Sequence, residues 1–133
     1  MAGYSGTPLA RKLGIKEDSR VLLSNTPPDF TLPDLPPGVT PHRRATTGPY
    51  DVILGFCPDH ATLHARFPGW RDRMERNGGL WIAWPKKSSG IPTDLTDTVI
   101  REYGLTQGLV DNKVAAIDDT WSGLRFVIRL ADR

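Results

Sequence analysis

Short runs of apolar residues that do not alternate with polar ones constrain this fold more than any other feature of the sequence. Such runs are typical of strands covered on both faces. They occupy residues 20–25, 50–56 and 80–84. Helical patterns follow the second and third runs, and strands that alternate with helices predict a parallel sheet with helices on its faces.

Two further strands are predicted near the end of the chain, over residues 109–117 and 124–130. The second of these alternates apolar with other residues, as half-buried strands do. Only residues 118–123 separate the two strands, so they should pair as an antiparallel hairpin. At 133 residues the chain has the length of one domain. We therefore predict a single three-layer, Rossmann-like α/β domain over residues 1–133, with a mostly parallel sheet and a C-terminal antiparallel hairpin.

Helix boundaries can be predicted because Ser, Thr and Asp favour the position before a helix, and Gly the position after it. The predicted N-terminal caps are Thr7, Asp59, and either Thr93 or Asp94. The predicted stops are Gly14, the pair Gly78 and Gly79, and Gly104. Pro8 fits the first turn of the first helix, which together with its lead-in covers residues 1–19. Pro68 should interrupt the second helix near Arg66, with a further helical piece reaching Asn77.

Residues 26–49 form the one compositionally unusual segment. Six prolines lie between Thr26 and Pro41, a density that no long helix survives. We expect an irregular but ordered loop, with a short strand near residues 39–43. The apolar residues Phe30, Leu32 and Leu35 favour packing on the domain over the alternative, a disordered linker.

The charge balance argues against a large nucleic-acid interface. The formal net charge is only +2, too little to neutralise many phosphates. We interpret the basic residues 42–44, and the arginines of residues 66–76 with their neighbouring acids, as solvated faces. No apolar segment resembles a signal peptide or a membrane span. The single cysteine, Cys57, is compatible with a cytoplasmic protein.

The order of elements resembles the C-terminal half of class I methyltransferases. Asp51-Val52-Ile53 is similar to a strand motif of that family, Gly78 to Ile82 is similar to its glycine-led strand, and the final hairpin is typical of it. These features span about residues 50–130. The resemblance also implies a glycine-rich cofactor loop after the first strand. That loop is missing, since no glycine lies between Gly14 and Gly38. We therefore expect shared architecture without shared chemistry, and predict no cofactor.

A second resemblance is to a small bacterial family of unassigned activity. It rests on three motifs, Tyr4 to Lys16, Trp84 to Gly90, and Trp121 to Leu124. They are spread over most of the chain. This resemblance implies no substrate, cofactor or catalytic residue.

The loop that follows the third strand is the first candidate site. Ligands of open α/β sheets bind at the carboxyl ends of the strands, and a helix beginning near Thr93 would add free N–H groups. The candidate ligand-binding residues here are Lys86, Lys87, Ser88, Ser89, Gly90, Thr93 and Asp94. They could hold a phosphate or carboxylate. The alternative is a solvated turn whose serines satisfy local backbone groups.

Two weaker candidates complete the set. Trp121 and Ser122 could form a wall over the same edge, or Trp121 could pack on a neighbouring chain. Alternatively, Trp121 folds onto its own hairpin and Gly123 supplies a positive φ. Cys57, His60 and His64 are residue types that bind zinc or form a thiol–imidazole pair. A buried cysteine beside surface imidazoles is the simpler interpretation.

These observations favour a non-enzymatic binding module that holds an anionic small molecule or a protein partner at residues 86–94. One alternative is a relic or unrecognised enzyme of methyltransferase-like fold, which should bind S-adenosylmethionine. The other is a structural protein that forms homo-oligomers.

Overall fold

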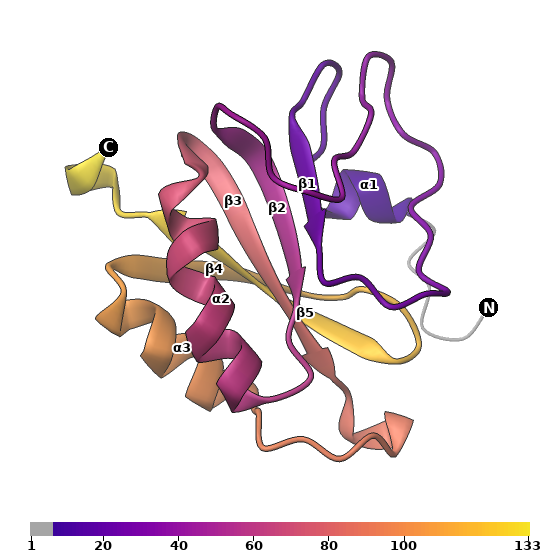
Figure 1. Ribbon diagram of the computed structural model, residues 1–133, viewed down its shortest axis with the longest axis vertical. Coiled ribbons are helices and arrows are strands. Elements are labelled where there is room, and N and C mark those ends of the chain that lie inside the picture. The colour runs from indigo at the N-terminus through magenta and orange to yellow at the C-terminus, as the bar shows by residue number, and fades with distance from the viewer. Residues whose placement is uncertain (1–6) are drawn as a thin grey trace.

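The computed structural model describes residues 7–133, and in this part of the chain five strands form one sheet (Figure 1). The strands are β1 (Val21–Ser24), β2 (Tyr50–Phe56), β3 (Met74–Pro85), β4 (Leu109–Ala116) and β5 (Trp121–Ile128). The helices are α1 (Leu9–Lys12), α2 (His60–Asp72) and α3 (Asp97–Thr106), with 3-10 turns η1 (Lys87–Ser89) and η2 (Leu130–Asp132). The sheet order is β1-β2-β3-β5-β4. The first three strands are parallel, and β5 runs antiparallel to both β3 and β4. The predicted α/β fold with its closing hairpin is confirmed.

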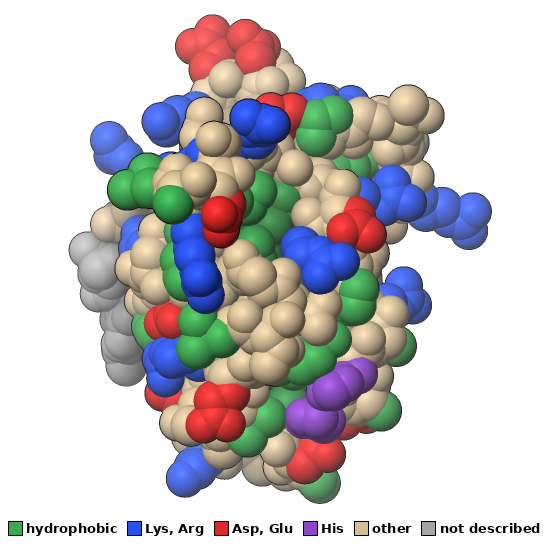
Figure 2. Space-filling model, turned by 90° about the vertical axis from the view of Figure 1, so that its left-hand side faces the viewer, with side chains coloured by type: hydrophobic (Ala, Val, Ile, Leu, Met, Phe, Trp, Pro, Cys, Tyr) green, Lys and Arg blue, Asp and Glu red, His purple; other side chains and the backbone are tan. Residues whose placement is uncertain are grey.

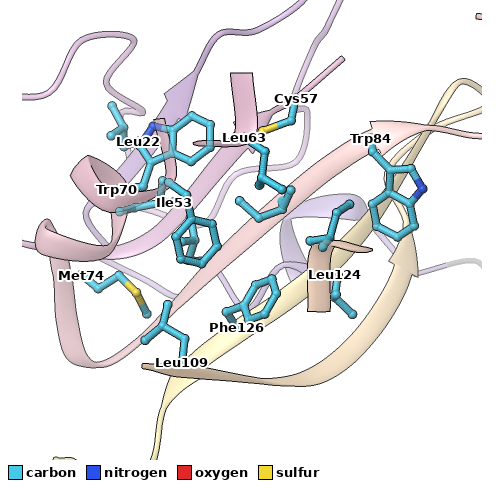
Figure 3. Packing of buried hydrophobic residues seen from close by; sticks show 14 of the residues in the cluster. Leu22, Ile53, Cys57, Leu63, Trp70, Met74, Trp84, Leu109, Leu124 and Phe126 are labelled. Carbon is cyan, nitrogen blue, oxygen red and sulfur yellow. The ribbon is translucent and has the colours of Figure 1, made fainter. Parts of the chain in front are cut away.

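Two apolar clusters, one on each face of the sheet, form the core. Helices α2 and α3 lie together over one face (Figure 1) and bury the cluster shown in Figure 3. Helix α1 and apolar residues of the proline-rich segment cover the other face. Trp81 and Trp84 belong to different clusters because their odd spacing in β3 points them to opposite faces. The chain has no helix, within residues 7–133, that is long and apolar enough to cross a membrane.

The proline-rich segment covers the free edge of β1. Residues 26–49 contain neither a helix nor a strand, only an isolated bridge between His42 and Leu22. The His42 carbonyl accepts a hydrogen bond from the Leu23 N–H, and the His42 N–H donates one to the Val21 carbonyl, both 2.8 Å long. Phe30 is buried. The segment thus satisfies part of an edge that would otherwise expose unpaired backbone groups.

Helix α2 departs from the prediction because it continues through Pro68. Asp59 caps it as expected, accepting a hydrogen bond from the Thr62 N–H at 2.8 Å. The helix then runs unbroken to Asp72. A proline inside a helix costs about 3 kcal/mol, but α2 buries Leu63, Phe67 and Trp70. Each such side chain contributes about 1.5–3 kcal/mol, so burial outweighs the break.

The helix expected to reach Asn77 ends at Asp72. Met74 already pairs with Tyr50, and Gly79 pairs with Val52, so this stretch is the first half of β3. Gly78 and Gly79 therefore lie inside a strand instead of ending a helix. Backbone pairing with β2 decides the outcome, and no local residue pattern signals such pairing.

The boundaries of α3, α1 and β5 are also corrected. Helix α3 begins after Thr96, which accepts a hydrogen bond from the Val99 N–H, and not at Thr93 or Asp94. Gly104 lies inside α3; the helix ends before Gly108, whose φ is +85°. Helix α1 begins at Leu9, with Pro8 instead of Thr7 at the N-cap, although Gly14 ends it as predicted with a φ of +84°. Finally, β5 begins at Trp121 and ends at Ile128.

Candidate functional site

The loop after β3 is held in shape by its own polar side chains. The Ser89 hydroxyl donates to the Lys86 carbonyl at 2.6 Å and accepts from the Ile91 N–H at 3.2 Å. Gly90 adopts a φ of +75°, the left-handed conformation that favours glycine. Ser88 is exposed. Ser89 thus behaves as the alternative interpretation describes, since its hydroxyl satisfies local backbone groups.

Thr93 and Asp94 fasten this loop to the start of α2. The Thr93 hydroxyl donates to the Pro58 carbonyl at 2.7 Å and accepts from the Leu95 N–H at 3.1 Å. Asp94 Oδ1 accepts from the His60 N–H at 2.8 Å. That N–H is one of the free donors of the first turn of α2. Both side chains therefore use hydrogen bonds to join the loop to the start of α2, and these bonds are not available to a ligand.

A cavity of about 310 Å³ lies beneath this loop. It is lined by Trp84, Pro85, Lys87, Thr93, Asp94, Leu95, Thr96 and Asp97. Among the described residues, neither Lys86 nor Lys87 forms a side-chain hydrogen bond or an ion pair. The cavity nevertheless places two carboxylates beside one ammonium group, so an anion here would meet repulsion as well as attraction.

Trp121 and Ser122 do not line this cavity. Trp121 pairs with Pro85, and its ring packs edge-on against Phe56 with centroids 5.1 Å apart. It belongs to the cluster under α1, on the opposite face from Trp84. Ser122 pairs with Trp84 in the strand. Gly123 pairs with Ala83 inside β5 and has no positive φ, so the expected turn glycine is wrong.

The structure supports neither a thiol–imidazole pair nor a metal site at Cys57, His60 and His64. Burial raises the pKa of the Cys57 thiol to about 12, and the nearby Asp59 adds to the rise. A thiol with that pKa is a poor nucleophile and metal ligand near neutral pH. The His60 and His64 rings stack with centroids 4.2 Å apart, and purple side chains lie together at the surface in Figure 2. Within residues 7–133, no group of three or more His, Cys, Asp or Glu could hold a metal ion.

The face in Figure 2 carries blue and red side chains interspersed. Positive charge gathers around a cavity of about 350 Å³ between residues 43–45 and helix α2. We call it the arginine cavity. It is lined by Leu22, Ser24, Arg43, Arg44, Ala45, Ala65, Arg66, Gly69, Trp70 and Arg73. None of these lining residues is acidic.

Most of the guanidinium donors in the arginine cavity have no partner among residues 7–133. Arg43 donates to the Thr26 hydroxyl at 2.9 Å. The side chains of Arg44, Arg66 and Arg73 form neither a hydrogen bond nor an ion pair with a described residue. A guanidinium group carries five N–H donors in a planar fork that matches carboxylate and phosphate oxygens. The cavity is therefore lined by residues of one charge whose guanidinium donors are mostly unpaired with described residues.

Tyr50 joins the two walls of the arginine cavity. Its backbone N–H donates to the Arg73 carbonyl at 2.8 Å. Its hydroxyl oxygen accepts from the Thr46 N–H at 3.0 Å and lies 2.7 Å from Nδ1 of His42. Burial alone would raise the pKa of Tyr50, but the hydrogen bonds from Thr46 and the charges of Arg20 and Arg73 outweigh it and lower that pKa. The segments that carry the arginines are thus fixed relative to each other.

In the sequence these arginines fall into two separate groups, residues 42–44 and 66–76, each of which is predicted to be a solvated face. Residues 43 and 66 are far apart in the chain, and the loop lies next to α2 because His42 is bonded to β1 and to Tyr50. One local signal was available. Arg66 and Arg73 are seven residues apart, which places them on the same face of a helix.

The segment after β1 does not fit the backbone cradle of a methyltransferase cofactor. Pro27 and Pro28 have no N–H to donate. The Phe30 ring packs edge-on against Phe56 with centroids 4.9 Å apart, beside the ends of the strands. A cavity of about 490 Å³ opens next to this segment, and the charged residues lining it are Asp29, Asp34 and Asp118. The charged residues of this cavity are thus negative, whereas those of the arginine cavity are positive.

Comparison with known proteins shows a similarity of fold. No family model matches the chain, and no curated protein sequence does. A LepI variant in complex with SAH and a substrate analogue matches with a TM-score of 0.51 and 15% identity, over 91% of this chain and 39% of that one. LepI in complex with SAM gives 0.50 and 14% over the same shares. A ribosomal protein L11 methylase from Lactobacillus delbrueckii subsp. bulgaricus gives 0.47 and 10%, over 70% and 46%. The chain spans less than half the length of these proteins.

Proposed function

We propose that this protein is a non-enzymatic binding module that holds an anionic small molecule in the arginine cavity. The observation that carries the proposal is the convergence of Arg43, Arg44, Arg66 and Arg73 on one cavity that no acidic residue lines. Like charges gathered in one place repel each other, so an anion that enters relieves that repulsion as well as gaining hydrogen bonds. The class of ligand is the one expected from the sequence, but the site is not.

We place the ligand in the arginine cavity instead of the Lys86–Asp94 loop for an electrostatic reason. That loop has two lysines, but its cavity also contains the carboxylates of Asp94 and Asp97. Its hydroxyl groups at Ser89 and Thr93 are already engaged with backbone groups. The arginine cavity carries no such opposing charge. The hydrogen bonds of Tyr50 fix the backbone segments on its two sides relative to each other, so only the arginine side chains need to become ordered when a ligand binds.

Isothermal titration calorimetry with phenyl phosphate tests this function. The arginines are exposed, so we expect modest affinity that weakens with salt. The double variant Arg66→Ala/Arg73→Ala should bind about tenfold more weakly or worse. The matched control is Arg76→Ala/Arg129→Ala, which removes the same charge at exposed positions outside the cavity. It should change the affinity by no more than about twofold.

Three results would count against the proposal. The wild-type protein could bind neither phenyl phosphate nor inorganic phosphate, or both double variants could lose affinity equally, which would indicate general charge attraction. The affinity could instead fall only in Lys86→Ala/Lys87→Ala, which would return the site to the loop after β3. A parallel titration with S-adenosylmethionine addresses the enzyme alternative, because heat of binding at millimolar cofactor would favour a methyltransferase-like activity.

A further inference from the structure

Gly69 occupies a position where glycine weakens the fold. It lies within helix α2, directly after Pro68. Glycine inside a helix is less stable than alanine because the unfolded chain has more freedom to lose. Its φ is not positive, unlike those of Gly14, Gly90 and Gly108. The backbone at this position therefore does not require glycine.

Packing does not require glycine at position 69 either. At Gly104, which also lies in a helix, an added Cβ atom would collide with the Phe126 ring. At Gly55, in β2, it would collide with the Trp70 ring. At Gly69, which is exposed, the same atom would meet no described heavy atom within 4 Å beyond its chain neighbours and the backbone of its own helix. The missing Cβ atoms of Gly55 and Gly104 thus make room for aromatic side chains of another element. The space beside Gly69 is not filled by any described side chain.

The open space at Gly69 is part of the arginine cavity. Arg66 precedes it by three residues on α2, Arg73 is the residue directly after the last turn of that helix, and all three line the cavity. Apolar side chains line the same cavity, among them Leu22 and Ala65. The volume of about 350 Å³ lies within the range of small-molecule sites. The cavity therefore offers more than a place for a lone oxyanion.

We infer that the ligand of the arginine cavity is an organic phosphate whose apolar part lies against the α2 backbone at Gly69 while its phosphate group contacts the arginines. This inference rests on the proposed function and adds the chemical class of the ligand. Gly69 becomes a residue that determines specificity, since a side chain there would occupy the space of the apolar part. The apolar lining favours an organic phosphate over the free ion.

The test compares inorganic phosphate with phenyl phosphate on the wild-type protein and on Gly69→Ala. For the wild type, we expect phenyl phosphate to bind about tenfold more tightly, from burial of the ring. Gly69→Ala should raise the Tm by about 2–4 °C, because alanine favours the helix. The same variant should weaken phenyl phosphate binding about tenfold while leaving inorganic phosphate within about twofold.

Ala61→Gly serves as the matched control. Ala61 is exposed on the same helix and does not line the cavity. The change should lower the Tm and leave both affinities unaltered, which separates helix stability from binding.

The inference is overturned if Gly69→Ala leaves phenyl phosphate binding unchanged, if it lowers the Tm, or if the wild type binds the two probes equally. In the last case binding that is lost in Arg66→Ala/Arg73→Ala would still support the proposed function. If the wild type binds neither probe, the proposed function fails together with this inference.

Discussion

Replacing Gly104 with alanine should destabilise the protein, although the same change normally stabilises a helix. Gly104 is buried within α3, and the Phe126 ring lies directly against it. An added Cβ atom would come within 2.6 Å of Cζ and 2.8 Å of Cδ1 of that ring. Phe126 itself is fully buried and packs edge-on against Phe67, with centroids 5.5 Å apart. Figure 3 shows its ring inside the cluster between the helices and the sheet.

Two opposing contributions set the size of the effect. Alanine in place of glycine favours a helix by about 1 kcal/mol. Inserting a methyl group into a packed core costs about 1–3 kcal/mol, and the contacts place this site at the upper end of that range. The net expectation is a loss of about 1–2 kcal/mol in the free energy of unfolding. Replacing the Phe126 ring with the smaller side chain of leucine should relieve the clash. The losses in the free energy of unfolding caused by Gly104→Ala and Phe126→Leu should therefore sum to more than the loss in the double variant.

Urea denaturation, monitored by tryptophan fluorescence, measures these free energies of unfolding. The useful contrast is Gly69→Ala, the same substitution at a helical position with open space around it. The two variants should differ in sign. If Gly104→Ala proves as stable as the wild type or more so, the close approach of Phe126 to α3 described above is wrong.

Two further predictions concern titratable groups. Hydrogen bonds from Thr62 hold the pKa of Asp59 below its ordinary value of 3.8. The ionised carboxylate therefore stabilises α2 fully at pH values above 3.8. This stabilisation is lost as the pH falls through the pKa of Asp59 in the folded state. Asp59→Asn should therefore show a smaller fall in Tm between neutral pH and pH 2 than the wild type; an identical fall would contradict the cap. For Cys57, burial raises the thiol pKa to about 12, so iodoacetamide at pH 8 should leave the native protein unmodified and alkylate it fully in urea; rapid labelling without denaturant would show that the thiol is accessible.

The sequence located the strands better than the helices. The β2 strand matches its predicted range, Tyr50 to Phe56, because a continuous apolar run can be buried on both faces only in the centre of a sheet. The closing hairpin was predictable from its short turn, although β5 begins earlier than expected. Helix α2 was not, because the burial of Phe67 and Trp70 on either side of Pro68 outweighs a local signal to stop.

The candidate site was the harder part to predict. Lys86 and Lys87 are adjacent in the chain and so stood out as a motif, yet folding sets carboxylates beside them. Arg44 and Arg66 share no local pattern, yet line one cavity. The charge of a site is a sum over side chains that converge in space, and a sequence motif counts only those that are neighbours in the chain.

The sequence by itself determined the layers of this protein, because apolar runs and capping residues act over a few residues and leave their pattern in the chain. The tertiary structure alone decided which glycines are needed and where positive charge gathers. Gly104 and Gly69 have the same local helical setting, but only the first faces a ring from another element. Contacts between distant segments have free energies as large as the local preferences they override, and those contacts exist only after the sheet and helices have packed.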